Sequence, residues 1–183
     1  MSEDVKCRMC GKATEAQVHM LAGCGALAES KYMTRHNAAL KVIFYKLLKD
    51  LDLVTTVPPW YSQNTPKPLY ENKRRKALWD IPPYAEHAEV RNNRIDCTVI
   101  DKERKKVVLL EMSCPWFSNT EIKCAEKTNK YAPLQCELRR YPEYKIEQHN
   151  IIIDTLGGSS LRVKESIRQL IGSGRCHSVL RNM

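Results

Sequence analysis

The chain contains no long hydrophobic run, and no stretch of its 183 residues approaches the length needed to cross a bilayer. Its first residues are polar and do not resemble a secretory leader, so the sequence predicts a nuclear or cytosolic protein without a membrane partner. Glycine is scarce, and no Gly-x-x-x-x-Gly-Lys pattern accompanies Gly157-Gly158, which argues against a P-loop nucleotide site. The histidines form no Ser-His-Asp or Cys-His order typical of nucleophilic catalysis.

Acidic residues are also in deficit, because 30 Lys and Arg face 21 Asp and Glu and give a formal net charge of +9. Such a charge favours a polyanionic partner, since each neutralised phosphate releases counterions. The strongest basic run contains Lys73, Arg74 and Arg75, and shorter runs lie at 104–106 and 139–140. Each run alone is typical of a solvated loop, but together they are candidates to flank a DNA duplex or an RNA.

Two apolar segments, 95–100 and 107–112, are rich in β-branched residues and predict strands. The polar segment 101–106 between them predicts a hairpin turn. Asp96 begins the first strand and Glu111 ends the second, so we expect the two carboxylates at the same edge of the sheet.

A carboxylate at the end of an apolar strand is costly to bury without a partner, and a divalent cation with oxygen ligands is one such partner. Asp96 and Glu111 would leave positions on Mg²⁺ or Mn²⁺ open for water and phosphate oxygens. A single acid at a strand end is more often a solvated edge residue. The pair in this order predicts metal-dependent cleavage of a phosphodiester.

The segment 118–140 predicts a helix, which Pro133 should bend or end. Tyr131 lies in it beside a face with three lysines at i, i+4 and i+7. A lysine there can orient the attacking water or neutralise charge on phosphorus, and its neighbours are candidate DNA contacts. The three lysines are Lys123, Lys127 and Lys130.

The N-terminal segment has the cysteine and histidine spacing of a zinc knuckle, with three thiolates and one imidazole within eighteen residues. We expect a small module over 1–30 and a second, larger domain over 31–183. The other five cysteines have no framework spacing, which favours reduced, buried thiols. The zinc ligands predicted are Cys7, Cys10, His19 and Cys24, with His36 as a weaker alternative to His19.

The order Arg-x-Asp, fourteen residues, Glu, then Glu-Lys-x-x-Lys-Tyr resembles the restriction-like endonuclease domain of site-specific non-LTR retrotransposons, within the PD-(D/E)xK superfamily. The resemblance extends to a Cys-Cys-His-Cys knuckle upstream and to the segment 32–37, which contains Arg35 and His36. It implies an endonuclease that binds structural Zn²⁺ and catalytic Mg²⁺ or Mn²⁺. In it Asp96 and Glu111 are metal ligands, Lys127 is the catalytic lysine, and Lys130 and Tyr131 complete the motif.

The resemblance also implies that the protein nicks double-stranded DNA for target-primed reverse transcription, with a reverse transcriptase domain of a parent protein as a partner. A domesticated derivative is an equal expectation within this class. Two positions depart from the pattern: Ile95 replaces a proline, and Ser113 replaces the lysine that most of the superfamily places after the second acid. Arg35 and His36 are candidate DNA contacts, although His36 is also a candidate for a structural hydrogen bond.

The remaining segments predict a scaffold of the α/β class, a restriction-endonuclease-like mixed β-sheet flanked by helices. Helical spacing covers 34–53 and 160–171, and the segments 77–84 and 146–154 predict strands. The last strand follows a helix and should therefore lie parallel to the Glu111 strand. Residues 57–68 are proline-rich and predict an extended loop.

Three aromatic residues and two acids have open roles. Trp60, Tyr61 and Trp79 are candidates to stack on bases, but burial is the more common use of such residues. Glu86 or Glu89 is a candidate third metal ligand.

Two other classes compete with a nuclease. The chain is alternatively an inactive, zinc-containing nucleic-acid-binding module, in which the acid pair no longer cuts. The chain is also a candidate interaction protein, in which the zinc module binds another protein. Weak, salt-insensitive DNA binding would favour that class.

Overall fold

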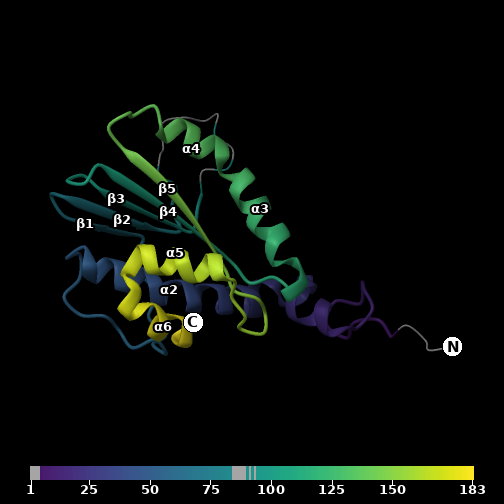
Figure 1. Cartoon of the computed structure of the whole chain (residues 1–183). Coiled ribbons are helices and arrows are strands. Elements are labelled where there is room, and N and C mark those ends of the chain that lie inside the picture. Colours follow the sequence, from purple (N-terminus) through teal and green to yellow (C-terminus); the bar gives the residue numbers. More distant parts are fainter. Residues whose placement is uncertain (1–4, 84–89, 91, 93) are drawn as a thin grey trace.

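A five-stranded mixed sheet is the centre of the fold (Figure 1). The computed structural model describes residues 5–83, 90, 92 and 94–183. The strand order follows the sequence, with antiparallel pairing from β1 to β4 and parallel pairing of β4 with β5. The strands are β1 (Leu69–Glu71), β2 (Arg75–Trp79), β3 (Cys97–Asp101), β4 (Lys106–Ser113) and β5 (Lys145–Ile152).

The hairpin and the parallel strand confirm what the sequence predicts. β3 and β4 pair through Asp101 and Lys106 at the turn, and β5 joins β4 after a helical crossover. The strand β1 was not predicted, because its three residues follow Pro68 and carry no alternation long enough to detect. It pairs with β2 across a turn in which the Asn72 side chain accepts from two backbone N–H groups.

Helices cover both faces of the sheet. The crossover between β4 and β5 contains the 3₁₀ turn η3 (Phe117–Asn119) and the helices α3 (Thr120–Lys130) and α4 (Ala132–Leu138). These two replace the single predicted helix, because Pro133 occupies the first turn of α4. The others are α2 (Met33–Asp50), α5 (Leu161–Ile171) and α6 (Ser173–Asn182).

Two hydrophobic clusters fill the space between these layers. The larger packs α2, α5 and α6 against one face of the sheet, around Phe44, Leu110 and Ile167. The smaller lies on the other face, where Leu134 and Leu138 of α4 pack against the sheet. Because side chains alternate along a strand, β4 supplies both clusters and is buried along most of its length. The chain is therefore a mixed α/β protein with a sheet flanked by helices.

The N-terminal segment projects from the end of α2, away from the sheet (Figure 1). It contains the short helical turns η1 (His19–Gly23), α1 (Gly25–Leu27) and η2 (Ala28–Tyr32). The expected domain boundary at residue 30 falls inside η2, which leads directly into α2. No helix in the described part of the chain combines the length and apolar character needed to cross a membrane.

Candidate functional site

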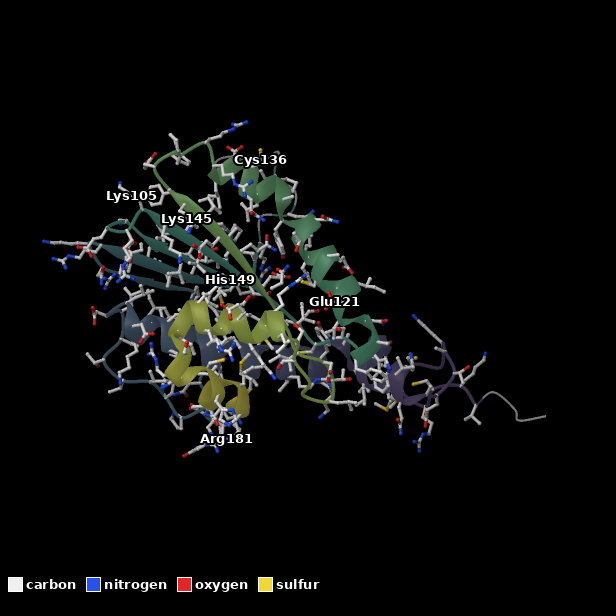
Figure 2. All side chains as sticks on the ribbon, in the orientation of Figure 1. Lys105, Glu121, Cys136, Lys145, His149 and Arg181 are labelled. Carbon is white, nitrogen blue, oxygen red and sulfur yellow. The ribbon has the colours of Figure 1, made fainter. Side chains whose placement is uncertain are left out.

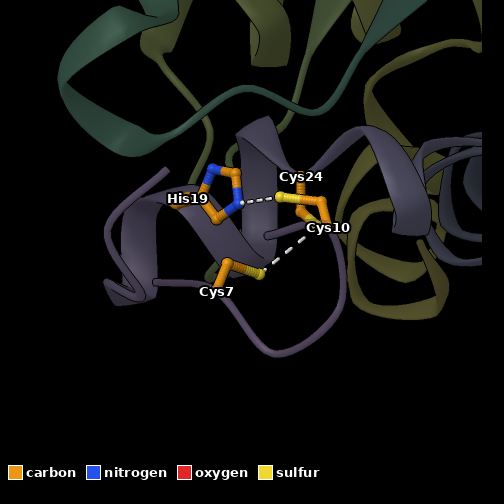
Figure 3. A group of neighbouring side chains, drawn as sticks. All are labelled: Cys7, Cys10, His19 and Cys24. Carbon is orange, nitrogen blue, oxygen red and sulfur yellow. Dashed lines mark hydrogen bonds between the residues drawn. The ribbon is translucent and has the colours of Figure 1, made fainter. Parts of the chain in front are cut away.

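Four predicted zinc ligands meet in the N-terminal segment (Figure 3). The ligand atoms of Cys7, Cys10, His19 and Cys24 all lie within 4.8 Å of one another. The Cys7 and Cys24 sulfurs are 3.8 Å apart, and the Cys10 sulfur lies 3.2 Å from His19 Nε2. Tetrahedral zinc with Zn–S bonds of about 2.3 Å separates its sulfurs by about 3.8 Å. The donor set and its spacing therefore fit a tetrahedral metal ion such as zinc.

The local backbone explains how the ligands converge. Between Cys7 and Cys10 the chain forms a tight turn in which Gly11 donates its N–H to the Cys7 carbonyl at 2.7 Å. Gly11 has a φ of +65°, which glycine adopts at low cost. Among the described residues 5–32, the only buried side chains are Cys7 and Cys24. Because the described part of this segment buries so little apolar surface, a bound metal would add greatly to its stability.

Backbone N–H groups favour the metal-binding thiolate form of Cys7 and Cys10, whereas burial raises the pKa of Cys24. A hydrogen bond from the Lys12 N–H lowers the pKa of Cys10. Burial alone would raise the pKa of Cys7, but the N–H groups of Cys10 and Met9 lower it below its usual value. His19, rather than His36, completes the group, since His36 lies beside Asp96.

The two predicted acids, Asp96 and Glu111, meet where β3 begins and β4 ends. The backbone N–H of Asp96 donates to Glu111 Oε2 at 3.3 Å, and the N–H of Met112 donates to Asp96 Oδ2 at 2.7 Å. Antiparallel pairing of β3 with β4 produces this arrangement, because Cys97 lies opposite Leu110. The hairpin thus brings together two carboxylates that have fourteen residues between them in the chain.

Lys127 of α3 pairs with Glu111 Oε1 and so joins the two acids. We call this group of side chains, Asp96, Glu111 and Lys127, the acid pocket. Glu111 is only 1% exposed, and burial together with the charge of Asp96 raises its pKa. Burial opposes the charged form of Lys127, but its hydrogen bond to Glu111 and the nearby Asp96 raise its pKa overall. The pocket therefore holds two acids and an ammonium group in close contact.

Tyr131 is buried beneath this pocket. Its hydroxyl donates to the Arg94 carbonyl at 3.0 Å, which ties the end of α3 to the chain just before Asp96. Burial and the charge of Glu111 raise the pKa of Tyr131, so the phenol stays protonated. Lys130 is exposed, and its ammonium lies 4.8 Å from the Tyr131 ring centroid. The structure thus places Tyr131 as a support and Lys130 on the outer surface.

His36 also belongs to the acid pocket, which the sequence did not indicate. Its Nε2 lies 3.1 Å from Asp96 Oδ2 and 3.2 Å from the Met112 carbonyl. Burial would lower the pKa of His36, but the hydrogen bond to Asp96 raises it above its usual value. The side chain is buried and both ring nitrogens have hydrogen-bond partners, and a DNA contact of His36 stays a prediction. The structural hydrogen bond, the other expected role, is the one observed.

Side-chain amides attach α3 to the sheet. No residue of α3 is buried, so apolar packing does not hold this helix in place. Instead, Gln148 of β5 donates to the Lys127 carbonyl at 3.2 Å, and Asn150 donates to the Cys124 carbonyl at 3.2 Å and to Thr128 Oγ1 at 2.7 Å. The run of polar residues from Glu147 to Asn150 within this strand was the available signal for this contact. These bonds position Lys127.

Replacing Asn150 by leucine is expected to lower the free energy of unfolding by about 1–3 kcal/mol, because the Cys124 carbonyl and Thr128 hydroxyl lose their donor. Urea denaturation measures the change. Asn129→Leu is the matched control, since Asn129 is an exposed amide on α3 itself. Equal losses in both variants would contradict this role for Asn150.

The other predicted nucleic-acid contacts do not gather at the acid pocket. Arg75 is half-buried and pairs with Asp52 and Asp101, so its guanidinium already has acidic partners, and its predicted contact with nucleic acid stays a prediction. Because Arg75 lies opposite Asp101 and Trp79 opposite Cys97, the basic run is about 16 Å along the strands from Asp96. Lys73 and Arg74 lie in the β1–β2 turn at that same far end.

Figure 2 shows the two ends of the sheet, with Lys105 and Lys145 at the far end and Glu121 on α3. Lys123 pairs with Glu126 at 2.6 Å rather than with the acids. Arg35 lies nearer the pocket and donates to the Leu21 carbonyl at 2.7 Å, which joins α2 to the N-terminal segment. Glu86 and Glu89 lie outside the described residues.

Comparisons with known proteins do not assign the chain to a family. No family model, curated protein or solved structure matches it. The geometry of the two sites therefore carries the functional argument.

Proposed function

We propose that the protein is a metal-dependent DNA endonuclease that hydrolyses phosphodiester bonds. The observation that supports this most is the convergence of Asp96, Glu111 and Lys127 in one pocket, although they come from β3, β4 and α3. Two acids and an ammonium group at the edge of a sheet provide oxygen ligands for a cation and a positive charge for phosphate. The net charge of +9 agrees with a polyanionic substrate.

The acid pair is suited to Mg²⁺ or Mn²⁺. Asp96 and Glu111 would hold the ion, which polarises the phosphate and lowers the pKa of a bound water. Burial of Glu111 next to Asp96 raises the pKa of Glu111, which indicates that the two like charges repel and that a cation between them would relieve the repulsion.

The residues of the chain have separate roles in this proposal. Lys127 neutralises charge that develops on the phosphate or orients the attacking water. His36 holds the Asp96 carboxylate through Oδ2 and leaves Oδ1 to face a ligand. Cleavage of this kind leaves a 3′ hydroxyl and a 5′ phosphate.

The mixed sheet that carries the acids is consistent with the restriction-like nuclease class, and the lysine on the helix after the sheet resembles the retrotransposon branch of that class. Within that class we propose a relationship to the retrotransposon enzymes, with the zinc-fitting N-terminal segment as the knuckle. Nicking of target DNA for a reverse transcriptase, or a domesticated use of that activity, is then the biological role.

Supercoiled plasmid tests the proposal. Purified wild-type protein in Mg²⁺ or Mn²⁺ should convert it to nicked or linear product, and Asp96→Asn should not. Glu121→Gln is the matched control, because Glu121 is an exposed acid on α3 away from the pocket. Equal products from wild type and Asp96→Asn would indicate a contaminating nuclease and contradict the proposal.

The second candidate is a nucleic-acid-binding module that does not cut. One observation favours it: Glu111 accepts from Lys127 through one oxygen and from the Asp96 N–H through the other, so both oxygens already have partners. Absence of product from any variant, combined with retained DNA binding, would select this candidate.

A further inference from the structure

A pocket of about 360 Å³ lies between α2 and the loop that follows it, away from the acid pair. The loop, residues 51–68, runs beside α2 and α6 on the side away from the sheet (Figure 1). Three lysines of α2 line one wall, and Trp60 and Asn64 of the loop line the other. The lysines are Lys41, Lys46 and Lys49.

The pocket has a positive charge that the protein does not neutralise. None of the described residues that line it is acidic. Lys46 and Lys49 form no ion pair with any residue in the described ranges, whereas other surface cations do, such as Lys102 with Glu71. Asp50, the next acid along α2, is bound to Arg175. An anion in the pocket would therefore meet two ammonium groups without ion-pair partners among the described residues. They lie at positions i and i+3 of α2, on the same face of the helix.

The loop presents two aromatic rings beside these lysines. Trp60 is 55% exposed and Tyr61 is 67% exposed, and their rings lie 5.6 Å apart and nearly perpendicular. Among the three aromatics considered as base-stacking residues, only Trp79 is buried, in the main core. Proteins that bind single-stranded nucleic acids present exposed aromatic rings, on which the bases stack, next to positively charged side chains.

The loop is fixed in place rather than free to fold over the rings. Lys41 donates from its ammonium to the Ser62 carbonyl, so one lysine anchors the loop to α2. The Ser62 N–H donates to the Pro59 carbonyl at 2.9 Å, which closes a turn around the two aromatic residues. Pro58 and Pro59 restrict the backbone before the turn. A prearranged platform loses little conformational entropy on binding.

We propose that this surface binds single-stranded nucleic acid, with backbone phosphates on Lys46 and Lys49 and an unpaired base on Trp60. A single strand is the favoured ligand because a base can stack on a side chain only when it is unstacked from its neighbours. Lys46 is ten residues along α2 from His36, which places the surface about 15 Å along the helix from the acid pocket. The inference does not depend on cleavage, because the two surfaces share no residue.

Fluorescence anisotropy with a labelled single-stranded DNA oligonucleotide tests the inference, using the zinc-loaded 183-residue chain without added Mg²⁺. Trp60→Leu is expected to weaken binding about tenfold, the effect of losing one stacked base. Lys46→Gln/Lys49→Gln is expected to reduce the slope of log K against log salt by about 1.4, or 0.7 for each phosphate contact. Lys102→Gln/Lys145→Gln removes the same charge at the far end of the sheet and should change neither quantity.

Three results would overturn the inference. They are unchanged affinity in both Trp60→Leu and the Lys46/Lys49 variant, an equal loss in the far-end control, and equal affinity for a blunt duplex of the same length. Circular dichroism and thermal melting confirm that each variant is folded, and Tyr61→Ala provides a second aromatic variant. If the protein binds single strands through Trp60 but does not nick plasmid, the cleavage proposal is contradicted and the present inference stands.

Discussion

Replacing Cys24 by serine is expected to abolish stoichiometric zinc binding and to unfold the N-terminal segment. Structural zinc sites in small finger peptides contribute about 10–16 kcal/mol, and among the described residues 5–32 only Cys7 and Cys24 are buried. The main cluster around α2 and the sheet contains neither cysteine, so it should remain folded. We expect one zinc per wild-type chain by metal analysis, and rapid proteolysis of the N-terminal segment in Cys24→Ser.

Cys136→Ser is the matched control, because Cys136 is an exposed thiol on α4 and lies outside the ligand group. It should retain one zinc and the protease resistance of the wild type. A full equivalent of zinc in Cys24→Ser, or equal protection of the segment after zinc removal, would contradict the metal assignment. The same measurement on His19→Ala tests the imidazole ligand separately from the thiolates.

Replacing Lys127 by methionine is expected to eliminate plasmid cleavage, with a fall of about 10²–10⁴ in rate if the proposed activity is present. It should also destabilise the metal-free protein by on the order of 2–3 kcal/mol, since Glu111 is left buried without its partner. Uptake of a proton by Glu111 limits this loss, because the pKa of Glu111 is already raised. Plasmid nicking and urea denaturation measure the two effects.

The double variant Glu111→Gln/Lys127→Met separates the effect on cleavage from the effect on stability. It removes both charges, so we expect it to recover part of the lost stability and none of the cleavage. Lys123→Met is the matched control, since Lys123 is one turn earlier on α3 and pairs with Glu126 on the surface. If Lys123→Met loses as much cleavage as Lys127→Met, the effect is general surface charge and not a role of Lys127.

The sequence was sufficient for elements that local pattern specifies. A polar turn between two apolar segments predicted the pairing of β3 with β4, and a helix before β5 predicted the parallel pairing. Pro133 predicted the division of the crossover helix, because proline lacks the N–H that a continuous helix needs. The four residues that could hold a metal ion were predictable because they lie close together in the chain.

The sequence was not sufficient where residues meet across the fold. His36 precedes Asp96 by sixty residues, and only the packing of α2 at the sheet edge brings them within 3.1 Å. Arg75 belongs to a basic run that looked exposed, but the pairing of β2 with β3 places it beside Asp101. The exposed Trp60 and the buried Trp79 could not be distinguished by residue type.

The amino-acid order alone determined the excess of positive charge and the cysteine and histidine spacing. It also predicted strands β3 to β5 and the main helices, because these depend on patterns among residues close together in the chain, whereas the short strand β1 carries too short a pattern to detect. The tertiary structure decided which charges lie together: Lys127 with Glu111, His36 with Asp96, and Lys46 with Lys49 beside Trp60. The reason is physical. Ionic and hydrogen-bond contacts act over a few ångströms in space, and sheet register and helix docking set those distances.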